Sequence, residues 1–382
     1  MKLFHIKVDN MKKIPLISFT IAYVILIISM SGLCHAKVTG VCYNCHTMHN
    51  SQGGAAMAQE YSSGSGGLTG DTTPNPCLLS YDCVGCHFSS TANTIVSVGS
   101  SNIPIVLNST APASPLAGGN FYWLVNTGDK YGHNVYGIKT QEGSPMDAPP
   151  GFTAGAGTPS GYGSGPASWA TQLNCAGVYG CHGDRTQGAT AATVVEAMKG
   201  GHHADDSAID GTSTGKSYRF LRGVNGVELN AAGYKWEQTA DSTHHNGYKG
   251  GATPGTTTDG ISYLCGSCHG NFHGHANLGG STQVGSSSPW FRHPTDFAFS
   301  GVEGGYAGSE YDDYTSYSTT TPVALSTPST STSTVDSTSM VICLSCHRAH
   351  GSPNYKMIRW DYKSATLSTA LSGCNVCHTS KN

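Results

Sequence analysis

The sequence predicts a fold of mostly irregular coil, with few short helices and very little strand. Gly accounts for 50 of the 382 residues, whereas apolar residues make up only 38% of the chain. Segments rich in Gly, Ser, Thr and Pro recur along it, and such segments favour turns and extended loops. A chain of this length normally builds a large core, but long segments with a regular apolar period are missing. We therefore expect apolar surface other than side chains to fill the interior.

Regular structure is expected at two places only. Residues 190–199 have their apolar side chains on one side and predict a short helix, and residues 103–107 predict a brief strand. The tract 314–339 is rich in Ser and Thr, with Tyr and Pro among them, and is expected to be an extended surface segment. The sequence leaves open whether this tract is glycosylated.

The N-terminus has the pattern of a secretory signal peptide. Two lysines precede a mostly apolar run at residues 14–30, and Cys34-His35-Ala36 follows as a cleavage site. The alternative is a membrane anchor, but the run is short for a membrane span. We expect a signal peptide at residues 1–36 and one mature domain at residues 37–382, without a membrane span, in an oxidising compartment.

Charge and cysteine content narrow the class of protein. Only 11% of the residues are charged and the formal net charge is -3, so no basic field points to nucleic acid. The 14 Cys and 18 His greatly exceed what a chain carries without a metal or redox reason.

One short element, Cys-x-x-Cys-His, occurs five times. The five motifs are Cys42, Cys45 and His46; Cys83, Cys86 and His87; Cys265, Cys268 and His269; Cys343, Cys346 and His347; and Cys374, Cys377 and His378. Two thiols at this spacing reach the two vinyl groups of one haem, and the next residue presents its imidazole to the iron as the proximal ligand. Zinc is the alternative, but zinc does not require a His after every pair. The motifs therefore predict covalently bound haem c.

A sixth candidate has five residues between its cysteines instead of two. It consists of Cys175, Cys181 and His182, and two glycines in the spacer would let the longer loop bulge. The alternative is a local Cys175–Cys181 disulfide beside an ordinary His. Haem is favoured because a long stretch without haem would otherwise separate the second and fourth sites. We expect six haems per chain, or five if this site is not loaded.

The second axial ligand, called distal here, decides between electron transfer and catalysis. Ten further His remain in the mature chain: His49, His133, His202, His203, His244, His245, His273, His275, His293 and His350. They suffice for two His on every iron, which leaves no open position for a substrate. The prediction is an electron carrier and not an enzyme. Cys77 is left without a role.

The spacing of some His excludes certain pairings. His46 and His49 are three residues apart, as are His347 and His350, so each pair lies on one side of a turn. The two members cannot bind opposite faces of one iron. His49 and His350 must therefore serve different haems or none, and a His that links one haem's peptide to the next iron brings the two haems close together.

Several motifs resemble a known family, the outer-surface hexahaem c-type cytochromes that polymerise into extracellular filaments, or cytochrome nanowires. The similar segments are residues 42–50, residues 343–350, Gly132-His133-Asn134, Arg292-His293-Pro294, the His269-to-His273 spacing and the C-terminal Cys374-Asn-Val-Cys-His378. They occur in the same order and are spread over most of the mature chain, whereas the loops between them are not similar.

The resemblance implies coil wrapped around a continuous chain of six haems, each with two His ligands. It implies that His49 ligates the haem held at His347 of a neighbouring protomer. His350 would then face the last haem, at His378, and His133, His273 and His293 are distal ligands of others. The third site departs from the family, because Asp184-Arg185 replaces a second His.

The distal ligand of this third site is expected from one of two His-His pairs. The candidates are His202 or His203, and His244 or His245, with His203 as the choice.

Three functions follow from this reading. The first is an electron conductor at the cell surface or in an extracellular filament, which passes electrons from outer-membrane cytochromes to external acceptors. The second is a monomeric multihaem carrier, in which His49 would be free or bound within its own chain. The third is a multihaem reductase, which needs an iron with an open position.

Overall fold

The structure is a computed structural model, and it describes residues 37–143, 148–152, 154–155, 166–169, 171–204, 208–251, 257–272, 293–302 and 305–380. The predicted signal peptide, His273 and His275 lie outside these residues. Within them, no helix has both the length and the apolar character needed to cross a membrane.

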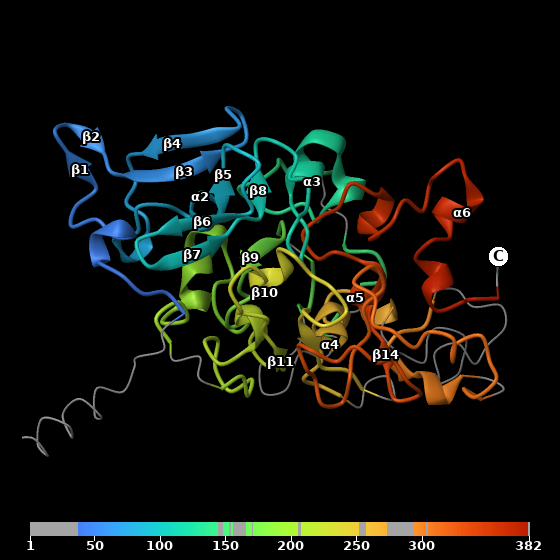
Figure 1. Cartoon of the computed structure of the whole chain (residues 1–382). Helices are drawn as coiled ribbons and strands as arrows, with labels where there is room; N and C mark the ends of the chain where they lie inside the picture. The colour runs from blue at the N-terminus through green and yellow to red at the C-terminus, as the bar shows by residue number, and fades with distance from the viewer. Residues whose placement is uncertain are drawn as a thin grey trace, which may run out of the picture.

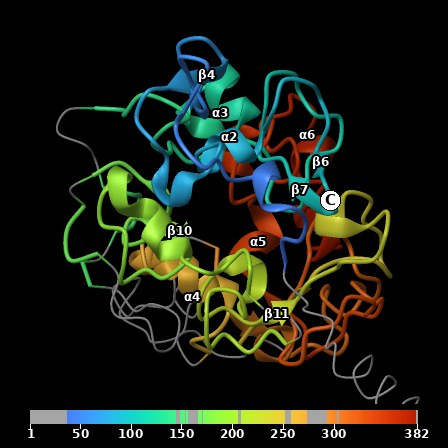
Figure 2. The ribbon, with the colours of Figure 1, turned by 90° about the vertical axis from the view of Figure 1, so that its left-hand side faces the viewer.

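Most of the described backbone is irregular, as the sequence predicts, and the α-helices are only four to six residues long. They are α2 (Cys83–Cys86), α3 (Tyr122–Thr127), α4 (Ile261–Gly266), α5 (Cys343–Cys346) and α6 (Leu367–Ala370). Helix α5 lies near the centre of the molecule, with coil segments around it (Figure 2). Strands β1 to β4 and helix α6 lie toward opposite ends (Figure 1).

The strands form seven separate two-stranded sheets. The pairs are β1 (Ser51–Gln52) with β2 (Ala55–Ala56), β3 (Ala58–Ser62) with β4 (Gly67–Asp71), β5 (Phe88–Ser89) with β8 (Leu107–Asn108), β6 (Ile95–Val98) with β7 (Ser101–Pro104), β9 (Asn174–Ala176) with β10 (Gly180–His182), β11 (Gly226–Val227) with β12 (Gly247–Tyr248), and β13 (Phe297–Ala298) with β14 (Met340–Val341). The β5–β8 and β9–β10 pairs are parallel and the others antiparallel. Sheets of two strands are marginal on their own, so they cannot be the scaffold.

Both predicted regular elements differ in detail from the structure. The expected helix is a 3-10 helix, Ala191–Met198, whose start is closed by a capping box between Thr190 and Thr193. The expected strand at residues 103–107 is divided between β7, which ends at Pro104, and β8, which begins at Leu107. Proline has no N–H to donate to a ladder, which explains the interruption.

The buried apolar side chains form three clusters. The first has ten buried members, including Tyr218, Tyr248 and Ile342, and the other two have seven each. The second is built around Leu124 and Ile138, which are almost completely buried. A divided core of this kind gives no continuous layer on which the loops could rest.

The Ser/Thr-rich tract 314–339 is not the surface segment that we expected. Its backbone has no helix or strand, but Tyr314, Tyr317, Val323 and Val335 are buried in the third cluster around Phe299. Apolar side chains at intervals anchor the tract, although its overall composition is polar.

Replacing Phe299 by Ala should therefore destabilise the C-terminal part of the fold. Phe299 is 1% exposed, and removing a buried Phe costs about 3–5 kcal/mol. Chemical denaturation of the haem-loaded protein, followed by circular dichroism, measures the change. The control is Tyr136→Ala, where the side chain is 56% exposed and a change within about 0.5 kcal/mol is expected. Equal effects of the two substitutions would contradict a core at Phe299.

Candidate haem sites

Each Cys-x-x-Cys-His motif folds into one helical turn. The backbone N–H of the His donates to the carbonyl oxygen of the first Cys at 2.9–3.2 Å, and the donors are His46, His87, His269, His347 and His378. Residues three and four apart in such a turn lie on one side of it. Both thiols and the imidazole can therefore reach the same bound group.

The sixth motif has a different local fold. Strand β9 carries Cys175, and β10 carries Cys181 and His182, and the two strands pair in parallel. Gly177 has a φ of +85°, and its carbonyl accepts the N–H of Gly180 at 2.9 Å, so the long spacer turns back tightly. Both thiols are free. The alternative of a disulfide between them is therefore wrong.

Backbone carbonyls orient the imidazoles of five of the six motifs. The Nδ1–O distances are 2.7–3.0 Å, and the acceptors are Cys77 for His46, Pro104 for His87, Arg219 for His182, Pro150 for His269 and Lys356 for His347. A carbonyl oxygen only accepts, so Nδ1 must carry the proton and Nε2 keeps its lone pair. This tautomer is the one that binds a metal through Nε2.

Three of these carbonyls belong to left-handed turns. Two successive residues other than Gly have φ between +49° and +62° in each turn: Cys77-Leu78, Arg219-Phe220 and Lys356-Met357. The first residue accepts the Nδ1–H, and the second accepts the N–H of the residue after the His, at 2.7–2.9 Å. Left-handed backbone costs roughly 1–2 kcal/mol per residue of this kind. The strained turns therefore coincide with the places where an imidazole is held.

The role of Cys77 thus lies in its backbone and not in its thiol. Sequence reasoning missed this because it assigned functions to side chains, and a left-handed turn at Cys77 and Leu78 has no Gly or Asn to announce it.

Four pairs of imidazoles face each other across the same gap. Their ring centroids are 6.1–6.2 Å apart, and the pairs are His46–His203, His133–His269, His182–His350 and His293–His378. The angle between the ring planes varies from 24° to 80°, so stacking does not set the distance. A metal–imidazole bond is about 2 Å long and the ring centre lies about 1 Å behind the nitrogen, which places two rings on one iron about 6 Å apart. The gaps therefore fit an iron with two His ligands.

His350 faces His182, which corrects the sequence assignment of His350 to the last haem. That haem's motif, at His378, has His293 opposite it. The reason is a long-range contact, because Gly351 forms a bridge with Gly132 and so brings the segment after His347 to the middle of the chain.

His203 faces His46, whereas the sequence argument assigned it to the third site, at His182. The adjacent His202 lies near the second site. Burial, and after it the proximity of His87, lowers the pKa of His202 to about 4. The two members of the pair therefore lie near different sites, where the sequence argument treated one as a bystander.

His87 and His347 are the two attachment His that have no imidazole ring facing them at this spacing among the described residues, and of the two His87 has His202 nearby. His49, the ligand that the family resemblance assigns to this haem from a neighbouring protomer, is exposed.

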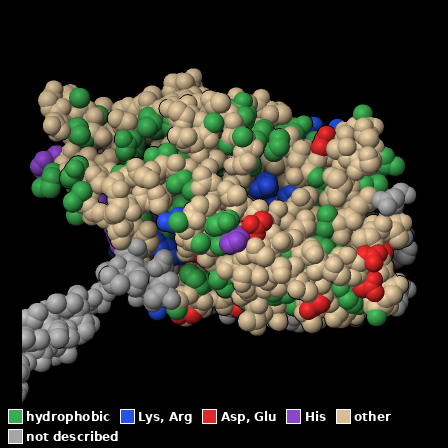
Figure 3. All heavy atoms as spheres, viewed as in Figure 1, with side chains coloured by type: hydrophobic (Ala, Val, Ile, Leu, Met, Phe, Trp, Pro, Cys, Tyr) green, Lys and Arg blue, Asp and Glu red, His purple; other side chains and the backbone are tan. Residues whose placement is uncertain are grey.

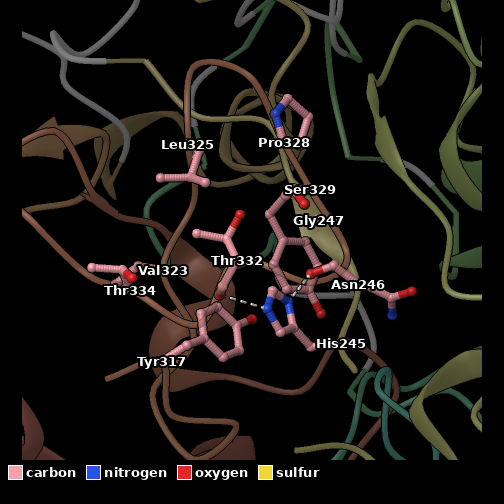
Figure 4. Close-up of a pocket in the computed structure, with 11 residues that line it drawn as sticks. His245, Asn246, Gly247, Tyr317, Val323, Leu325, Pro328, Ser329, Thr332 and Thr334 are labelled. Atoms are coloured by element: carbon pink, nitrogen blue, oxygen red, sulfur yellow. Dashed lines mark hydrogen bonds between the residues drawn. The ribbon is translucent and has the colours of Figure 1, made fainter. Parts of the chain in front are cut away.

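His244 and His245 have other partners. Figure 4 shows His245 buried against Tyr317, with Nδ1 directed to the Asn246 carbonyl at 2.9 Å and Nε2 to the Thr332 carbonyl at 3.0 Å. Neither nitrogen is left for a metal. His244 is half-buried: its ring stacks on Tyr234 with the centroids 4.1 Å apart, and its Nδ1 contacts the Asp241 carboxylate at 3.1 Å.

Burial favours the neutral form of some of the paired imidazoles. It lowers the pKa of His182 and of His269 to about 4 and that of His350 to about 3. Neutral imidazole is the form that binds iron, so the environment favours ligation at neutral pH.

Each motif has a thiol near enough to a thiol of the next motif to interact with it electrostatically. The five pairs are Cys45 and Cys86, Cys83 and Cys175, Cys181 and Cys268, Cys265 and Cys343, and Cys346 and Cys374, and of these Cys265 and Cys343 are hydrogen-bonded. Burial raises the pKa of Cys86, Cys175, Cys181 and Cys346, and the thiol of the neighbouring motif raises it further, whereas at Cys265 the hydrogen bond with Cys343 is the largest cause. The six candidate sites therefore form one unbroken file in sequence order.

The thiols do not suit zinc. Burial raises the pKa of Cys86 and of Cys346 to about 12, so both are uncharged at neutral pH, whereas zinc binds the thiolate. In the described ranges no group of three or more His, Cys, Asp or Glu is arranged to hold a metal ion by itself. An uncharged thioether suits these positions.

Arg185, which stands near the place of the family's second His at the third site, is buried. Its guanidinium donates to the Ser267 hydroxyl and to Cys268 Sγ, the latter at 3.8 Å. The residue therefore connects the third site to the fourth and ligates nothing.

Comparisons with known proteins find the doubled Cys-x-x-Cys-His motif and a similar c-type cytochrome. A family model described as "Doubled CXXCH motif" matches residues 336–382. C-type cytochrome OmcS of Geobacter sulfurreducens is 27% identical over 412 residues, which cover 97% of this chain and 91% of that protein. The chain resembles an OmcS-type cytochrome. Two solved OmcS filament structures from Geobacter sulfurreducens are 18% and 20% identical, with TM-scores of 0.41 and 0.44, and cover 91% of this chain and all of theirs.

Replacing His350 by Ala should leave one haem per chain without its distal ligand. The loss of one of two axial imidazoles converts a low-spin iron to a high-spin iron. Optical and electron paramagnetic resonance spectra of the haem-loaded protein measure the high-spin fraction, expected at about one haem in six. The control is His244→Ala, which should leave the spectra unchanged. A high-spin signal in the control and not in His350→Ala would contradict the pairing.

The sixth motif is tested by the mass of the intact chain. Replacing Cys175 and Cys181 by Ala should remove one haem and leave five, because both thioethers at that site are lost. Replacing Cys77 by Ala, which keeps the backbone carbonyl, should leave the number of haems unchanged. Equal masses of haem on the native chain and the double variant would show that His182 carries none.

Proposed function

We propose that the protein carries out extracellular electron transfer as a six-haem c-type cytochrome that polymerises head to tail into a conductive filament. The observation that carries this proposal is the series of six sites in which a thiol of each motif lies near a thiol of the next motif. When bound, each haem supplies a ferric/ferrous couple. The chain sets the spacing between the haems and supplies the axial ligands, and filled axial positions exclude the binding of a substrate to the iron.

The paired imidazoles argue for a carrier over a reductase. Four sites place two imidazoles at the spacing of a closed iron, and His202 lies near a fifth site, at His87. An iron with both axial positions filled has no place for a substrate and changes little on reduction. The third site, where an open position was conceivable from the sequence, has His350 opposite His182.

The sixth iron, at His347, supports polymerisation. We propose that its second ligand is His49 of the neighbouring protomer. His49 is exposed, and Val41, Tyr43 and Met48 close to it in sequence are 56%, 79% and 83% exposed. Figure 3 shows hydrophobic and His side chains together at one end of the molecule, where β1 and β2 lie. Exposed apolar side chains of this size indicate a contact surface.

The setting follows from the same proposal. The chain is exported through a cleaved signal peptide and works at the cell surface or in an extracellular filament. Its partners are further copies of itself, other outer-membrane cytochromes and extracellular electron acceptors. The runner-up is a monomeric multihaem carrier, which needs a ligand for His347 within the same chain.

Replacing His49 by Ala tests the polymer. The variant should still load six haems, but one haem per chain should become high-spin because the iron at His347 loses its second ligand. It should also fail to form filaments in electron cryo-microscopy, because the bond from His49 to the neighbouring protomer is lost. The control is His244→Ala, which removes a His whose side chain is 41% exposed and should polymerise normally. Filaments with all irons low-spin in the His49 variant would refute the bridging role, and discrete low-spin particles of the native protein would favour the monomeric carrier.

A further inference from the structure

The last attachment His is held differently from the other five. His378 directs Nδ1 to a carboxylate oxygen, Oε1 of Glu310, at 3.1 Å, whereas the others donate to backbone carbonyls. The distance lies within the normal range for an N–H···O bond. An acceptor with a full negative charge thus replaces a neutral dipole at one of the six sites.

The carboxylate of Glu310 is fixed in this position. Its side chain is 13% exposed, and that of His378 is 23% exposed. Oε2 accepts the hydroxyl hydrogen of Ser380 at 2.8 Å, and the Glu310 carbonyl accepts that of Thr379 at 2.8 Å. The two residues after His378 therefore hold both ends of Glu310 against the imidazole.

Further acidic groups lie at this end of the chain. The Asp313 carboxylate accepts a second contact from the Thr379 hydroxyl at 2.8 Å, and Tyr311 packs edge-on against His378 with the ring centroids 5.3 Å apart. Acidic side chains gather on the surface near the C-terminus in Figure 3. Asp313 therefore carries a negative charge near this site but does not accept the hydrogen bond from the His378 imidazole.

A carboxylate acceptor changes the ligand itself. It polarises the Nδ1–H bond, which makes Nε2 a stronger electron donor to a bound metal. A more basic ligand stabilises ferric iron relative to ferrous iron and so lowers the reduction potential. We propose that Glu310 is a positioning residue that gives the haem at His378 the lowest reduction potential of the chain. This inference rests on the proposed haem at Cys374, Cys377 and His378.

The decisive variant is Glu310→Gln in the haem-loaded protein. Glutamine keeps the size and an oxygen acceptor but removes the charge. We expect the ferric/ferrous equilibrium of one haem in six to shift about tenfold toward ferrous, or ~59 mV for one electron. Spectroelectrochemical titration at one neutral pH, with the low-spin signals followed by electron paramagnetic resonance, measures the lowest-potential component.

Two further variants distinguish the effect of the Glu310–His378 hydrogen bond from the effect of a nearby negative charge and from an effect on folding. Asp313→Asn removes one negative charge near the same site but leaves the hydrogen bond to His378 Nδ1 in place. It should shift the ferric/ferrous equilibrium of the lowest-potential haem by less than about threefold. Glu310→Asp keeps the charge and should retain a potential closer to the native value than Glu310→Gln. Equal shifts in Asp313→Asn and Glu310→Gln, or no shift in Glu310→Gln with six haems bound, would overturn the role of Glu310.

The mass of the native chain separates this inference from the proposed function. If the peptide with Cys374 and Cys377 carries no haem, the six-haem function itself fails. If that peptide carries haem and the potentials of the variants match the native ones, only the inference about Glu310 fails.

Discussion

The hydrogen bond from an imidazole Nδ1 to a fixed oxygen is the interaction on which the rest of the structure depends. In the part of the chain that the structure describes there is no large sheet, the longest α-helices have six residues, and the apolar clusters are separate. Such a framework cannot aim a side chain by packing alone. The carbonyls of Cys77, Arg219 and Lys356 aim three imidazoles instead, and left-handed turns present those carbonyls. The strain of the turns persists because neighbouring contacts over-determine them.

A second constraint is that the sites follow one another in sequence order while their ligands do not. A thiol of each motif lies near a thiol of the next motif along the chain. The facing imidazoles, by contrast, come from positions as distant as His46 and His203, or His182 and His350. The resulting cross-links tie remote coil segments together. Loops that would be mobile on a surface become the walls of a file of sites.

The sequence was sufficient for the coil fold and the attachment motifs because composition and Cys-x-x-Cys-His spacing are local properties. The pairing of His was not local. The i to i+3 spacing of His347 and His350 excluded one arrangement but could not reveal that Gly351 meets Gly132. Composition also misled at residues 314–339, where four buried Tyr and Val side chains outweigh the polar majority. The backbone role of Cys77 and the carboxylate of Glu310 depend on contacts that no sequence pattern marks.

The distance in sequence between facing imidazoles bears on how the protein matures. A chain that is exported from its N-terminus delivers His46 long before His203, and His182 long before His350. Attachment of a haem needs only one motif, whereas the second axial ligand comes from a remote segment. The order of synthesis therefore separates these two steps in time. Two sites have their second His ahead of their own motif, because His293 precedes His378 and His133 precedes His269. If haem is bound as proposed, maturation passes through a stage in which the sites at His46 and His182 still lack their second imidazole.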